Sequence, residues 1–174
     1  MKLQRRTLLL GAATSLLAAC GGGDEDHDPL GTIVGVAQAN PAFSTLVAAV
    51  VKAGLVDTLN GTGPFTVFAP TDAAFGTALT ELGLTQDQLL DSPLLGDILK
   101  YHVVSGRVLK ADVPVGVDIA TVLGTTETFR INGALAITDE AGRVTNITAT
   151  DVLASNGVIH VIDRVLLPSA FRTT

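Results

Sequence analysis

The sequence predicts a single folded unit of the α+β class, in which helices and strands are segregated along the chain. Apolar residues recur with helical spacing in the first half, and a period of two takes over from Asp118. The chain has 174 residues, 47% of them hydrophobic and 16% charged. It is therefore long enough to bury one sizeable core and too apolar to be disordered throughout.

The first helix is predicted to begin at Asn40 and Pro41, a pairing of a capping side chain with a proline in the first turn. Gly54 is predicted to end it. One apolar stripe runs between these limits through Phe43, Leu46, Val47, Val50 and Val51.

A short apolar run over residues 65–69 predicts a buried strand. Thr71 or Asp72 can then cap a helix that carries Phe75 and Leu79. Residues 85–88 (TQDQ) have the spacing of a capping box and predict another short helix.

Ser92 and Pro93 are predicted to start a further helix, with His102 on its apolar face. The chain should then turn into a strand through residues 101–104, and Gly106 should end that turn.

Alternating residues predict hairpins in the second half of the chain. Residues 132–133 (NG) are typical of a type I′ turn, with Leu135 and Ile137 on the return strand, and residues 139–142 (DEAG) predict the next turn. Val144 and Ile147 have opposite parity, which predicts a bulge or a late strand start. The nearly continuous apolar run over residues 158–167 predicts a central strand buried on both faces.

The N-terminus has the features of an export signal. Lys2, Arg5 and Arg6 precede the uncharged, mostly apolar residues 8–19, a stretch too short to span a bilayer, which takes about 20 residues. Residues 4–10 (QRRTLLL) also resemble a twin-arginine signal, so the export route stays open.

Residues 17–20 (LAAC) resemble a bacterial lipobox. We therefore expect residues 1–19 to be removed and Cys20 to be acylated, which would anchor the protein to a membrane. The alternative is a buried first helix that ends at a free thiol. Gly21 stands where an aspartate would indicate retention in the inner membrane, which weakly favours the outer membrane.

The glycine-rich and acidic residues 20–29 are predicted to be a flexible tether, and residues 30–172 to be the folded domain. The formal net charge of −6 argues against a nucleic-acid partner. One cysteine cannot form an internal disulfide, and no Cys/His spacing predicts a zinc site. We expect no cofactor and no metal.

Three segments resemble the motifs of fasciclin domains, in the order of that family: residues 66–75 (TVFAPTDAAF), 101–104 (YHVV) and 154–168 (ASNGVIHVIDRVLLP). The resemblance implies a fasciclin-like β-wedge or sandwich packed beside several short helices. It also implies a structural role for the motif residues Asp72, Tyr101, His102, Asn156, Gly157 and His160.

The resemblance further implies a non-catalytic protein of the cell envelope, facing the periplasm or the cell exterior, that acts in adhesion or binding. Animal members carry an Asp-Ile pair before the last motif that is implicated in integrin binding. Asp151 and Val152 occupy that place and are candidates for an adhesive contact. The partner would be an unknown surface protein or polysaccharide.

Two other functions stay open. One is a binder of small ligands or polysaccharides, with a preformed cleft between helices and wedge. The other is a hydrolase that uses His102 and His160. Against the hydrolase, no G-x-S-x-G elbow is present, and His160 and Asp163 would face opposite sides of one strand.

Overall fold

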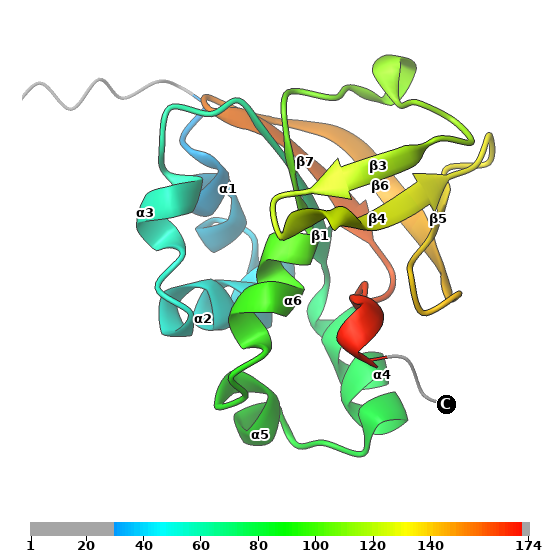
Figure 1. The fold of residues 1–174 in the computed structure, drawn as a ribbon. Helices are drawn as coiled ribbons and strands as arrows, with labels where there is room; N and C mark the ends of the chain where they lie inside the picture. Colours follow the sequence, from blue (N-terminus) through cyan, green and yellow to red (C-terminus); the bar gives the residue numbers. More distant parts are fainter. Residues whose placement is uncertain (1–29, 172–174) are drawn as a thin grey trace, which may run out of the picture.

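A computed structural model describes residues 30–171, in which short helices group beside a strongly bent sheet (Figure 1). The α+β prediction is confirmed. The export signal, Cys20 and the whole predicted tether lie outside the described residues. The helices are α1 (Ile33–Gln38), α2 (Ser44–Lys52), α3 (Val56–Leu59), α4 (Asp72–Leu82), α5 (Gln86–Leu90) and α6 (Leu95–Tyr101), with 3-10 turns over Pro41–Phe43, Lys110–Asp112 and Ser169–Phe171.

Local capping sets most helix starts. Asn40 accepts a hydrogen bond from the Ala42 N–H and leads through a 3-10 turn into α2. The capping box of Thr85 and Gln88 at α5 is confirmed. Of the two candidates at α4, Thr71 is the cap, since its hydroxyl accepts the Ala74 N–H.

Two helix predictions need correction, and two short helices were not predicted. The buried face of α2 differs from the predicted stripe, because Val51 is exposed and Ala49 is buried in the core. Ser92 accepts the Leu94 N–H, but regular helix begins only at Leu95. Helices α1 and α3 were not predicted, because they are too short to show a full helical period.

Seven strands form one sheet in the order β2-β1-β7-β6-β5-β4-β3. A backbone hydrogen bond of 2.7 Å from Val122 to Val103 joins the region of β3 to β2, so the sheet closes in a barrel-like manner. The strands are β1 (Phe65–Pro70), β2 (Val103–Ser105), β3 (Asp118–Thr121), β4 (Gly124–Ile131), β5 (Ala136–Thr138), β6 (Val144–Ala154) and β7 (Gly157–Ile162).

The hairpin between β4 and β5 is present, but its turn is not type I′. Neither Asn132 nor Gly133 has a positive φ, whereas Leu135 does, at 60°. The Asn132 side chain accepts the N–H groups of Ala134 and Ala136 and so organises the loop itself. Leu135 therefore belongs to the turn and not to the return strand. The next turn closes as predicted, between Asp139 and Gly142.

The central strand is shorter than predicted. β7 pairs with β1 in parallel and with β6 antiparallel, but it ends at Ile162 and not at residue 167. The bulge or late start predicted between Val144 and Ile147 is wrong, because β6 begins at Val144 and pairs regularly with β5 there. The register shifts of β6 lie further on, between Ile147 and Val152. The two shifts bend β6, which runs through both halves of the sheet.

The turn between β6 and β7 joins the helices to the sheet. The Asn156 side chain accepts the Ile33 N–H at 2.9 Å and donates to the carbonyls of Leu59 and Gly61, at 2.6 and 3.0 Å. A Cβ atom added to Gly157 would lie 2.1 Å from the Phe65 carbonyl oxygen. Only glycine therefore fits this close approach of β7 to β1.

We predict opposite effects for two fully buried threonines. The Thr145 hydroxyl has no hydrogen-bond partner among the described residues, so Thr145→Val should leave stability unchanged or raise it by up to about 1 kcal/mol. The Thr66 hydroxyl donates to the Gly106 carbonyl and accepts the Val108 N–H. The Thr66→Val substitution should therefore lower the free energy of unfolding by about 1–3 kcal/mol. Urea unfolding of both variants checks this, and equal losses would contradict it.

Candidate functional site

Both histidines of the last two motifs are buried, and their ring nitrogens are occupied by backbone groups. His102 ends α6, where Nδ1 donates to the Ile98 carbonyl at 2.7 Å and Nε2 accepts the Leu166 N–H at 2.9 Å. Burial lowers the pKa of His102 to about 4, so the ring is neutral at pH 7. The imidazole links α6 to the segment after β7 and has no nitrogen left for a substrate.

Tyr101, the neighbour of His102, is equally enclosed. Its hydroxyl donates to the Thr128 carbonyl and accepts the Glu140 N–H, which ties α6 to β4 and to the turn after β5. Burial raises the pKa of Tyr101. The Tyr-His pair therefore fixes a helix to two parts of the sheet.

Asp72 lies in the first turn of α4 but caps a different helix. Its carboxylate accepts the Ser44 hydroxyl and, at 2.8 Å, the Thr45 N–H, both at the start of α2. Burial acts to raise the pKa of Asp72, but these hydrogen bonds outweigh it and lower the pKa below its ordinary value. A carboxylate held ionised in this way suits a cap and not a general base.

His160 and Asp151 form a second cluster, on the adjacent strands β7 and β6. His160 Nε2 donates to the Val108 carbonyl at 2.9 Å, and Nδ1 accepts the Asp151 N–H at 3.4 Å. One carboxylate oxygen of Asp151 accepts the Lys110 N–H at 2.8 Å. The two side chains therefore hold the loop between β2 and β3 against β6 and β7.

Asp151 lies in the irregular part of β6 and has a φ of 58°, a left-handed conformation that aspartate tolerates better than most residues. Its side chain is half-buried, and its second carboxylate oxygen is not used in this cluster. Val152, by contrast, packs against the core on the helical side. Of the predicted adhesive pair, Val152 therefore contributes to the core, whereas Asp151 has one carboxylate oxygen outside the hydrogen bonds of this cluster.

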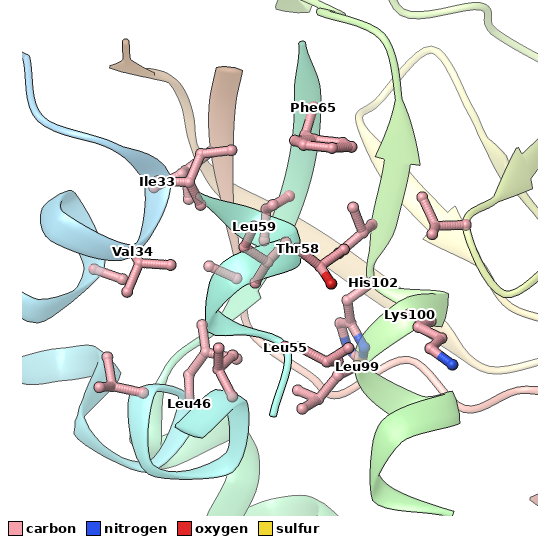
Figure 2. A pocket seen from close by; sticks show the side chains of 18 residues that line it. Ile33, Val34, Leu46, Leu55, Thr58, Leu59, Phe65, Leu99, Lys100 and His102 are labelled. Carbon is pink, nitrogen blue, oxygen red and sulfur yellow. The ribbon is translucent and has the colours of Figure 1, made fainter. Parts of the chain in front are cut away.

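An apolar cavity lies where the cleft between helices and sheet was predicted (Figure 2). Its volume is about 50 Å³, against about 150 Å³ for an apolar cavity that holds benzene. Its polar lining residues are Thr58, Lys100 and His102, and the nitrogens of His102 are already bonded. The cavity is therefore a small void in the core and not a preformed ligand site.

A larger, polar cleft lies on the opposite part of the molecule, over β3, β4 and β5. This cleft was not predicted from the sequence. Its volume is about 380 Å³, and its lining residues are Asp118, Thr128, Phe129, Arg130, Thr138, Asp139, Glu140 and Gly142. The polar residues of β4 that alternate with Phe129 and Ile131 were the available signal, but their neighbours come from other strands.

The described part of the chain contains no group of three or more His, Cys, Asp or Glu side chains that could hold a metal ion. Within residues 30–171, no helix is long and apolar enough to cross a membrane.

Comparison with known proteins identifies the family. The fasciclin domain model matches residues 41–168. The chain belongs to the fasciclin domain family. The sequence is 46% identical to the Synechocystis protein sll1483 over 139 residues, which cover 79% of this chain and 73% of that protein.

Two other similar proteins bear descriptive names. The cell surface glycolipoprotein MPB83 of Mycobacterium bovis is 36% identical over 156 residues, covering 83% of this chain and 62% of that protein. A fasciclin domain pair from the insect cell adhesion molecule fasciclin I superposes with a TM-score of 0.69 at 22% identity, covering 79% of this chain and 51% of that one. The superposition shows that the protein described here has the same fold as these fasciclin domains.

The pKa of His102 predicts a pH dependence of stability. The pKa of about 4 in the folded protein lies below the ordinary value of 6.5, so the unfolded chain binds more protons between these values. The free energy of unfolding should therefore fall as the pH drops from 6.5 to 4, by at most about 3 kcal/mol. Denaturant titrations at several pH values measure this loss.

His102→Gln should be less stable at pH 7 and should lose most of the slope between pH 6.5 and 4. An unchanged slope would show that another group titrates in this range. If His102 were catalytic and not structural, its replacement would leave the stability at pH 7 unchanged.

Proposed function

We propose that the mature protein is anchored to the bacterial envelope through an acylated Cys20 and acts there as a non-catalytic adhesion or binding module. The observation that carries the non-catalytic part is the complete occupation of the His102 and His160 rings by backbone partners. Membership of the fasciclin family and similarity to a cell surface glycolipoprotein support the location. Gly21 weakly favours the outer membrane, because an aspartate at this position would indicate retention in the inner membrane.

The proposed contact centres on Asp151. The residue lies in an irregular stretch of β6, beside the loop that carries Lys110, and one of its carboxylate oxygens is free of the hydrogen bonds of the cluster. Backbone conformations that are unfavourable for a side chain often persist at binding sites, because the surrounding structure maintains them. The loop hydrogen bonds hold this carboxylate in one orientation, which lowers the entropic cost of meeting a partner.

We predict that Asp151→Asn reduces attachment of the producing cells to their natural surfaces without unfolding the domain. Asparagine keeps an oxygen for the Lys110 N–H and tolerates a left-handed φ, but it carries no charge. The free energy of unfolding should change by less than about 0.5 kcal/mol. Attachment assays and denaturant unfolding give the two readouts.

Asp57→Asn is the matched control, because it removes an exposed carboxylate from α3 on the helical side. Cys20→Ser should abolish cell-associated attachment while leaving the domain folded, since it removes the acylated thiol. Unchanged attachment after deletion of the gene would overturn the adhesion role. If the Asp151→Asn strain attaches normally and the deletion strain does not, the adhesive contact lies elsewhere in the protein.

A further inference from the structure

The polar cleft over β3–β5 has the dimensions of a ligand site. Its volume of about 380 Å³ falls within the roughly 300–1,000 Å³ that is typical of small-molecule sites. It lies on strands that carry none of the fasciclin motifs. The motif residue Tyr101 bonds to the backbone of Thr128 and Glu140, but no motif residue lines the cleft itself.

The strand register builds the cleft. On β4, Phe129 and Ile131 point into the core, so Thr128 and Arg130 point to the other side. Arg130 lies opposite Asp118 of β3 and opposite Thr138 of β5. These three exposed side chains form one row across the sheet, and the turn at residues 139–142 closes one end.

Arg130 is the main hydrogen-bond donor of the row. Its Nε and Nη2 atoms donate to the two carboxylate oxygens of Asp118, a two-pronged contact that fixes the plane of the guanidinium. Guanidinium has five N–H donors, so about three remain for a ligand. The hydroxyl of Thr138 adds a further donor and acceptor, and each Asp118 oxygen keeps a lone pair.

The charges in the cleft restrict the class of ligand. Among the lining charges, Asp118 is paired with Arg130, Asp139 is buried and paired with Arg143, and Glu140 adds a further carboxylate. This excess of negative charge disfavours phosphates and other anions. The described residues offer no three-ligand metal site. Arg130 occupies the centre of the row, where it would repel a cationic group. A neutral ligand with many hydroxyl groups matches alternating donors and acceptors of this kind.

We propose that the cleft formed by Asp118, Thr128, Arg130, Thr138 and Glu140 binds a neutral, hydroxyl-rich saccharide. The inference deepens the proposed function, because it names a ligand class for an envelope binding protein. Phe129 is 2% exposed and offers no face for a sugar ring to stack on. Recognition therefore rests on hydrogen bonds, and a single site should bind weakly, with a Kd of about 1 mM.

The test is an NMR titration of the isotope-labelled full chain with three neutral hexasaccharides: cellohexaose, laminarihexaose and the N-acetylglucosamine hexamer from chitin. At least one should shift the amide resonances of β3–β5 in a saturable manner. Arg130→Gln should weaken that binding about tenfold, as expected for the loss of hydrogen bonds worth about 1.4 kcal/mol. Thr138→Val should weaken it less.

Lys52→Gln is the matched control. It removes an ion pair with Asp91 that is about as exposed as the pair of Arg130 and Asp118, but on the helical side. Exposed pairs contribute little stability, so both variants should stay folded. The proposal is overturned if no hexasaccharide binds, if Arg130→Gln binds like the parent, or if the shifts map to α1–α3. Loss of attachment in Asp151→Asn with intact saccharide binding separates this site from the adhesive contact.

Discussion

The close approach of β7 to β1 at Gly157 is the constraint on which the structure depends. The two strands pair in parallel over residues 65–70 and 157–162, as the second and third strands in the sheet order. Directly before Gly157, the Asn156 side chain bonds to backbone groups of α1, α3 and the loop after α3. One turn therefore sets the sheet register and the position of the first helices together.

The other motif residues repeat this use of polar side chains as structural links. Asp72 joins α4 to α2, Tyr101 joins α6 to β4, and His102 joins α6 to the chain after β7. Each buried polar atom in these links has a partner, as a low-dielectric core requires. The two binding sites that we propose, Asp151 and the cleft around Arg130, both lie outside these motifs.

The features that could be predicted from the sequence are those set by contacts between residues close together in the chain. The caps at Asn40 and Thr85 satisfy N–H groups two or three residues away, so they could be predicted directly. The end of β7 could not be predicted in this way. The apolar run continues beyond Ile162, but the N–H groups of Leu166 and Leu167 bond to His102 and Asp139 and not to a strand. The cleft was missed for the same reason, because its row of side chains comes from three strands whose register depends on the whole sheet.

Denaturant unfolding of Gly157→Ala, beside Gly133→Ala as control, tests most directly whether the fold depends on this approach. A Cβ at residue 157 would overlap the Phe65 carbonyl, whereas one at residue 133 meets nothing within 4 Å. The Gly157→Ala substitution should lower the free energy of unfolding by at least about 3 kcal/mol or prevent folding. The Gly133→Ala substitution should change it by less than about 0.5 kcal/mol. If the free energy of unfolding of Gly157→Ala lies within about 1 kcal/mol of the parent value, with the same cooperativity, the fold does not depend on this close approach.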